Sequence, residues 1–131
     1  MTGWVVLGAA VLLTGVLALV HRRYDGKLRH RAAGEDLRPL LTHHGEQATL
    51  LQFSSAFCAP CRATRATLAR AADQVDGVVR VELDAESNLE LVRRLGIVKT
   101  PTTLVLDRHG REVIRAAGQP RLADVLGALG T

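Results

Sequence analysis

Cysteine, proline and aromatic residues are all scarce in this chain of 131 residues. It contains two cysteines, four prolines, two phenylalanines, one tyrosine and one tryptophan. Two cysteines are too few for a disulfide-rich scaffold, and so little proline excludes a collagen-like or low-complexity chain. With 47% apolar residues, the chain is also too hydrophobic to be disordered. The length then allows one compact domain.

Charged residues are missing from the first 20 positions, which hold 15 apolar residues. The other 111 residues are about 42% apolar, slightly below the usual ~45–50% of a soluble domain. As a helix, the uncharged run from Trp4 to Val20 would cover roughly 26 Å, close to the ~30 Å hydrocarbon core of a bilayer. Trp4 and Tyr24 flank the run, where amphipathic rings meet lipid headgroups. We predict a transmembrane anchor over residues 1–21.

A cleaved signal peptide is the alternative interpretation of this run. Signal peptides carry lysine or arginine before the apolar segment and small residues at the cleavage site. No basic residue precedes the run, and Val20 is followed directly by His21 and Arg22. These departures favour a retained anchor.

Positive charge is concentrated directly after the apolar run. Residues 21–45 carry six basic side chains against three acidic ones, whereas residues 46–131 carry eleven against ten. The charge of +4 therefore lies mainly beside the membrane segment, which removes the main support for nucleic-acid binding. Because basic residues beside a span stay on the cytoplasmic side, we predict a single-pass cell-membrane protein with its N-terminus outside and its domain in the cytoplasm. A periplasmic or extracellular domain is the alternative, and the same charges would also attract anionic lipid headgroups.

Strand signals follow a basic juxtamembrane linker over residues 22–34. Apolar runs or alternation predict strands over residues 48–53, 79–83, 102–107 and 111–116, the last two joined by a hairpin turn. With the helices between them, these strands predict an α/β domain over residues 35–131. We expect a three-layer fold in which a mixed sheet of about four strands has helices on both faces.

Helix signals separate these strands. Apolar spacing predicts one helix beginning near Pro60, one over residues 89–95 and one beginning near Pro120. Ser87 and Glu90 form a capping box for the second of these helices, and Gly96 would end it. A shorter helix is predicted over residues 37–44, with His44 on its apolar face.

The segment Cys58-Ala59-Pro60-Cys61 lies between a predicted buried strand and a predicted helix. Unpaired N–H groups and the positive end of the helix dipole would stabilise a thiolate at Cys58. Cys61, one turn into the helix and facing the core, is shielded from substrates but close enough to attack a mixed disulfide at Cys58. Pro60 would start the helix and stiffen the loop. We predict Cys58 as the nucleophile and Cys61 as the resolving cysteine.

Two other uses of the cysteine pair were weighed. A zinc site would need further ligands, and the spacing of His43, His44 and His109 fits no zinc-finger pattern, so no metal is predicted. A purely structural disulfide would close only a four-residue loop and add little stability. Redox chemistry is therefore the favoured use.

Over residues 35–131 the chain resembles the thioredoxin family. The resemblance is carried by the run 51–57, the Cys-Ala-Pro-Cys motif, Asp84 at the end of a strand, and the segment 96–102. It implies a thioredoxin-like fold, a redox-active disulfide without a bound cofactor, and electrons from a thioredoxin reductase or another thiol donor. It also implies that Pro101 is a cis-proline beside the cysteines, and that Phe57, Thr100 and Pro101 bind an extended segment of a protein substrate.

Three positions depart from the family pattern. Phe57 stands where tryptophan is usual, and Gln52 stands where a buried aspartate assists proton transfer at the resolving thiol. Because an amide cannot take up a proton, we expect slow resolution of mixed disulfides. Arg80 stands in place of a lysine, so a cation faces the site without its usual acidic partner. Gln52, Arg80 and the residues between the cysteines, Ala59 and Pro60, are predicted to tune the site.

The sequence thus predicts a membrane-tethered thiol–disulfide oxidoreductase that reduces disulfides of protein partners. One alternative keeps this chemistry in an outward-facing domain that serves disulfide or cytochrome maturation. Another is a non-catalytic thioredoxin-like binding module or redox sensor, which the absence of a proton acceptor at Gln52 would suit.

Overall fold

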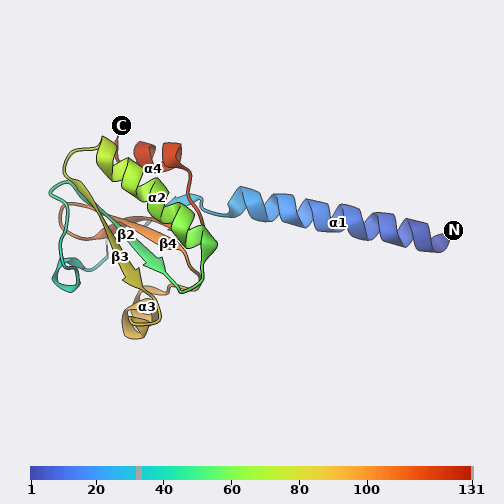
Figure 1. Ribbon diagram of the computed structural model, residues 1–131, viewed down its shortest axis with the longest axis horizontal. Helices are drawn as coiled ribbons and strands as arrows, with labels where there is room; N and C mark the ends of the chain where they lie inside the picture. The colour runs from blue at the N-terminus through green and yellow to red at the C-terminus, as the bar shows by residue number, and fades with distance from the viewer. Residues whose placement is uncertain (32–33, 131) are drawn as a thin grey trace.

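The computed structural model describes residues 1–31 and 34–130, which form a long N-terminal helix and an α/β domain (Figure 1). Helix α1 (Thr2–Tyr24) has a mean hydropathy of 2.4 and buries none of its residues. It is long and apolar enough to cross a membrane, and a signal sequence could have the same properties. Residues 2–21 of the predicted anchor lie in α1, and Met1 is its N-cap residue. Ala32 and Ala33 of the predicted linker, and Thr131, lie outside the described residues.

Five strands form one mixed sheet in the order β1-β5-β4-β2-β3. They are β1 (Leu28–His30), β2 (Ala48–Ser54), β3 (Val78–Asp84), β4 (Thr102–Leu106) and β5 (Glu112–Ala117). Only β2 and β3 pair in parallel, and the other neighbours are antiparallel. Strand β2 is buried along nearly its whole length, which explains its continuous apolar run.

The sheet has one strand more than the four we expected. Strand β1 comes from the segment 22–34, which we expected to be a linker, and it pairs with β5 from Leu28↔Ala116 to His30↔Ile114. Its three residues include only one apolar side chain, so no alternation predicts it. Backbone pairing with the otherwise open edge of β5 holds the strand in place and covers that edge.

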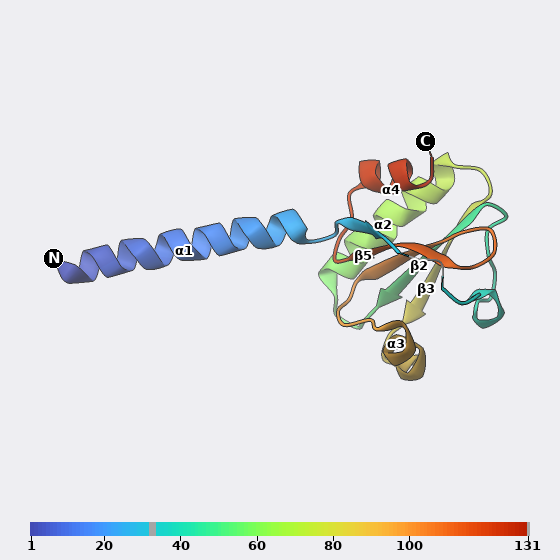
Figure 2. The same ribbon diagram turned by 180° about the vertical axis from the view of Figure 1, so that it is seen from behind.

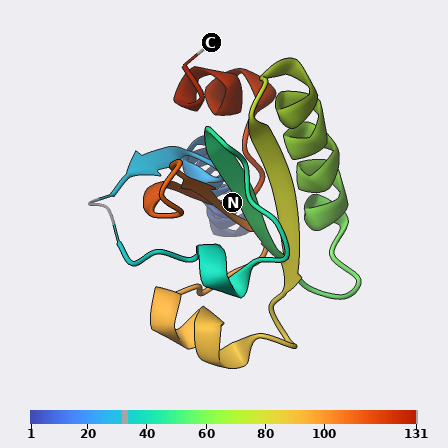
Figure 3. The ribbon, with the colours of Figure 1, turned by 90° about the vertical axis from the view of Figure 1, so that its left-hand side faces the viewer.

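The helices lie on both faces of the sheet, as predicted (Figure 2). Helices α2 (Ala59–Gln74) and α4 (Leu122–Ala128) pack on one face, over a core that includes Leu50, Leu68 and Val125. Helix α3 (Leu89–Leu95) covers the other face, over a core that includes Leu51, Phe53 and Leu104 (Figure 3). Adjacent residues of β2 therefore point to opposite layers. The predicted three-layer α/β fold is confirmed.

Two local predictions were wrong. Residues 37–44 form only a single 3₁₀ turn, η1 (Arg38–Leu40), which ends where the backbone of Leu41 becomes extended, and His44 is exposed. The capping box before α3 does not form either. Ser87 Oγ donates to Asp84 Oδ2 at 3.0 Å, so this hydroxyl is turned away from the helix, and the N-cap residue is Asn88.

Candidate active site

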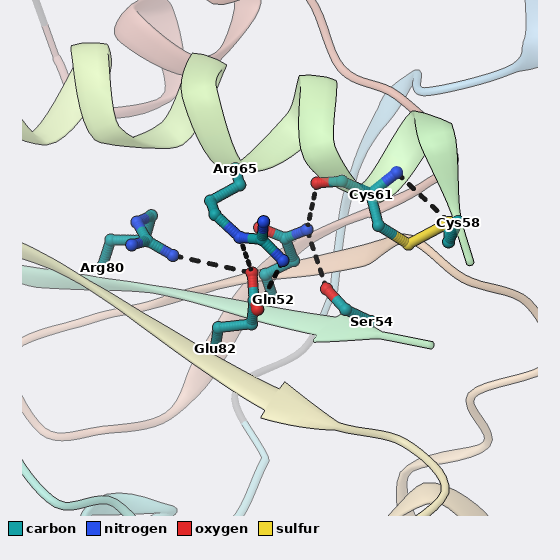
Figure 4. Close-up of polar contacts among 7 residues, drawn as sticks. All are labelled: Gln52, Ser54, Cys58, Cys61, Arg65, Arg80 and Glu82. Atoms are coloured by element: carbon teal, nitrogen blue, oxygen red, sulfur yellow. Dashed lines mark hydrogen bonds and ion pairs between the residues drawn. A yellow bond between two sulfur atoms is a disulfide. The ribbon is translucent and has the colours of Figure 1, made fainter. Parts of the chain in front are cut away.

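Cys58 and Cys61 form a disulfide at the start of α2, with their Cα atoms 5.2 Å apart. Cys58 is the N-cap residue, and the backbone N–H of Cys61 donates to its Sγ at 3.2 Å (Figure 4). Cys58 is partly exposed, whereas Cys61 is buried in the core. A partner can therefore reach the outer sulfur but not the inner one, and an N–H donor at the helix terminus is aimed at the outer sulfur.

Phe57, directly before the disulfide, has an unusual backbone. Its φ of 57° lies in the left-handed region, which bulky residues rarely adopt, and its side chain is fully exposed. Strained positions of this kind concentrate at functional sites. The ring forms an apolar rim beside Cys58.

The segment around Pro101 lies at the same end of the sheet as the cysteines. Because β2 and β4 are antiparallel, Phe53 near the end of β2 pairs with Thr102 at the start of β4. The Thr100–Pro101 peptide bond is cis, and Ser55 Oγ lies 2.7 Å from Thr100 Oγ1. The structure thus brings together the segments that carry Phe57, Cys58, Thr100 and Pro101.

Gln52 is fully buried beneath the first turn of α2. Its Nε2 donates to the backbone oxygen of Cys61 and to Ser54 Oγ, both at 2.9 Å (Figure 4). Its Oε1 has no hydrogen-bond partner among the described residues. The side chain therefore holds the backbone of the inner cysteine and brings no titratable group to it.

A charged cluster lies farther along α2, on the other side of Gln52 from the disulfide (Figure 4). Glu82, the neighbour of Gln52 in the parallel register, accepts two hydrogen bonds from Arg65 at 2.7 and 2.8 Å. Arg80 Nη1 lies 3.7 Å from Glu82 Oε2, so Arg80 has an acidic partner that we did not expect. The hydrogen bonds and charge of Glu82 raise the pKa of Arg65. The alternation over residues 79–83 already puts Arg80 and Glu82 on one face of the strand, so this partner could have been identified from the sequence.

The described residues contain no group of three or more histidine, cysteine, aspartate or glutamate side chains arranged to hold a metal ion. His43 and His44 are exposed, and His43 Nε2 lies 3.3 Å from the backbone oxygen of Arg80. His109 lies in the turn between β4 and β5. The chemistry that the site offers is thus that of the cysteine pair, which can exchange between dithiol and disulfide.

Comparisons with known proteins agree with this geometry. The thioredoxin family model matches residues 35–129. A thioredoxin from Alicyclobacillus acidocaldarius is 36% identical over 90 residues, which cover 63% of this chain and 85% of that protein. The human thioredoxin domain-containing protein 2 is 34% identical over 68 residues, which cover 52% of this chain and 12% of that protein.

The crystal structure of chloroplastic thioredoxin z has the same fold. It is 23% identical, with a TM-score of 0.58, over 65% of this chain and 77% of that one. The family match and the Cys58–Cys61 pair together support a thiol–disulfide oxidoreductase. The chain belongs to the thioredoxin family.

Proposed function

We propose that the chain is a membrane-tethered reductase of protein disulfides. The observation that carries this proposal is the asymmetry of the cysteine pair, since Cys58 is accessible at the start of α2 and Cys61 is buried behind it. Such an arrangement suits a reaction in which one sulfur meets the substrate and the other releases it.

The reaction begins with both cysteines reduced. The Cys58 thiolate attacks one sulfur of a substrate disulfide, a mixed disulfide forms, and the first substrate thiolate leaves. The Cys61 thiolate then attacks the Cys58 sulfur, which releases the second substrate thiolate and forms the Cys58–Cys61 disulfide. Two electrons pass to the substrate, and the two released thiolates take up protons. A thioredoxin reductase or another dithiol donor returns two electrons, and the chain itself binds no cofactor.

Phe57, Thr100 and Pro101 are the proposed substrate-binding residues. They lie on the two segments that meet beside Cys58, joined by the contact between Ser55 and Thr100. The first residue of β4 that pairs in the sheet is Thr102, so the backbone of Thr100 lies before the paired part of the strand. An extended segment of the substrate could pair with that backbone while Phe57 covers its apolar side chains.

Gln52 is proposed to act as a positioning residue. Its Nε2 donates hydrogen bonds to the Cys61 carbonyl and to Ser54 Oγ, and these two bonds fix the first turn of α2 on the sheet. Because the amide cannot accept a proton from the Cys61 thiol, mixed disulfides would be resolved slowly. A slow second step also fits the second candidate, a binding module or redox sensor that holds its partner.

Membrane tethering rests on α1, which is long, apolar and unburied within the described residues. The basic residues that follow it favour a cytoplasmic domain by the positive-inside rule. An outward-facing domain that serves disulfide or cytochrome maturation is the alternative.

Replacing Cys61 with serine should trap substrates. The Cys61→Ser chain can still form the mixed disulfide but cannot resolve it, whereas Cys58→Ser should form none and lose all turnover. Non-reducing electrophoresis of the two variants, followed by mass spectrometry, detects the complexes. A Cys61→Ser chain that forms no reducible complex with any protein disulfide would contradict the reductase mechanism. Complexes without measurable turnover in the unmodified chain would favour the redox sensor.

Replacing Gln52 with aspartate should speed the resolution step. A carboxylate at this position could take the Cys61 proton, and general-base assistance of this kind contributes on the order of 10²-fold or more. The matched control is Gln52→Asn, because asparagine has the same length as aspartate but no titratable group. Release of thionitrobenzoate from its mixed disulfide with Cys58, followed across a pH series, measures the step. If all three chains have the same pH profile, proton transfer at position 52 does not limit resolution.

The orientation of the domain can be tested with a membrane-impermeant maleimide on intact cells. After reduction with a permeant thiol, Cys58 should stay unlabelled until the membrane is permeabilised. A chain with both cysteines changed to serine and Thr2→Cys should be labelled without permeabilisation. Labelling of Cys58 in intact cells would place the domain outside.

A further inference from the structure

The junction between α1 and the domain is tightly bonded. Only three residues separate α1 from β1, and Asp25, the first of them, accepts a hydrogen bond from Lys99 Nζ at 2.8 Å. The N–H of Gly26 donates to the Ala117 oxygen at 2.9 Å, and the N–H of Gln119 lies 3.4 Å from Asp25 Oδ2. We call Asp25, Gly26 and Lys99 the junction clamp.

The backbone of Gly26 lies close against the segment before α4. Gly26 has a φ of 71°, and a Cβ at this position would collide with the backbone oxygen of Gln119. Burial raises the pKa of Asp25, but the bond and charge of Lys99 and the Gln119 N–H outweigh it and hold the pKa below its usual range. A lowered carboxyl pKa means that the ion pair is fully formed above about pH 4 and is lost as the pH falls through that pKa.

Lys99 of the clamp belongs to the segment that carries Thr100 and Pro101. Lys99 directly precedes Thr100, and the Pro101 oxygen accepts a bond from the Gly118 N–H at 2.7 Å. Thr67 of α2 lines a surface groove together with His21 of α1. In Figures 1 and 2, α1 leaves the domain on the side where α2 begins. The end of the domain that carries Cys58 therefore faces the anchor.

The anchor also sets the distance of this end from the bilayer. Val20 is the last residue of the apolar run, and the four residues that follow it in α1 add roughly 6 Å at ~1.5 Å per residue. The headgroup layer on each side of the hydrocarbon core is roughly 5–8 Å thick. A groove at the junction is lined by four basic residues, Arg22, Arg23, Lys27 and Arg121, and by the carboxylates of Asp25 and Asp124. The excess of two positive charges suits anionic headgroups.

Two fully exposed apolar side chains lie at the same end of the domain. Phe57 precedes Cys58, and Val98, which is 91% exposed, precedes Lys99 of the clamp. Exposed apolar side chains at this end suit a layer of intermediate polarity better than open water.

We propose that the anchor orients the active site as well as tethering it: the Cys58 face is held against the headgroup layer, and the preferred substrate is a disulfide within the first few residues outside the bilayer in a membrane-embedded protein. This inference rests on the proposed reductase activity and on α1 spanning the membrane. Disulfides that stand well above the bilayer meet the far side of the domain and react slowly.

The test uses the full chain in proteoliposomes with two single-span peptide substrates. Their disulfide loops lie on the same side of the membrane as the domain. The loop begins three residues beyond the span in one peptide and twenty residues beyond it in the other. The unmodified chain should reduce the near disulfide about tenfold faster, since its effective concentration at Cys58 is higher. Inserting ten glycine and serine residues between Tyr24 and Asp25, which lets the domain move by roughly 17 Å, should bring the two rates within about twofold.

Two controls separate orientation from other effects. The same ten residues inserted before Thr2 should leave the preference intact, because the anchor stays joined to the clamp. Asp25→Asn should reduce the preference, whereas Asp124→Asn, which removes the same charge from the same groove, should not.

Four results would overturn the inference. Equal rates on the two peptides, or a preference that survives the insertion after Tyr24, would mean that the clamp does not orient the site. Reduction of soluble insulin without reduction of either peptide would also overturn it and leave the proposed reductase activity standing. Failure to reduce insulin as well would overturn that activity, and this inference with it.

Discussion

The antiparallel pairing of β2 and β4 is the constraint on which the rest of the structure depends. It joins the end of β2, which leads to the cysteines, to the start of β4, which follows Pro101. Strand β5 pairs with β4 so that Ala117 lies beside Thr102, and the clamp residue Gly26 bonds to that same Ala117. A change of register here would move the disulfide, the cis-proline segment and α1 away from one another.

The interior beneath α2 is unusually polar for so aliphatic a domain. Gln52 is buried there, Thr103 lies opposite it in the register, and Thr64 lies one turn beyond Cys61. Gln52 Oε1, Thr64 Oγ1 and Thr103 Oγ1 have no hydrogen-bond partner among the described residues. Such groups cost roughly 1–3 kcal/mol each.

Much of the fold and the cysteine chemistry could be predicted because these features are local in sequence. The run at β2, the apolar stripe of α2 and the glycine after α3 each follow from a few adjacent residues. Strand β1 could not be predicted, because three residues with one apolar side chain pair only where β5 offers an edge. Lys99 meets Asp25 across 74 positions of sequence, which no local pattern spans, whereas the pair of Arg80 and Glu82 could have been predicted from strand alternation. The positive φ of Phe57 likewise follows from its surroundings.

The two sulfurs of the disulfide differ in exposure and in hydrogen bonding, and alkylation of the reduced full chain tests this difference most directly. Iodoacetamide is added across a series of pH values around neutrality, and mass spectrometry measures the modification of each cysteine. Because an N–H at the terminus of α2 is aimed at Cys58 while Cys61 is buried, Cys58 should react first and at the lower pH. Cys61 should stay unmodified until the domain unfolds. Equal rates at the two cysteines, or faster reaction of Cys61, would contradict the assignment of Cys58 as the attacking thiol.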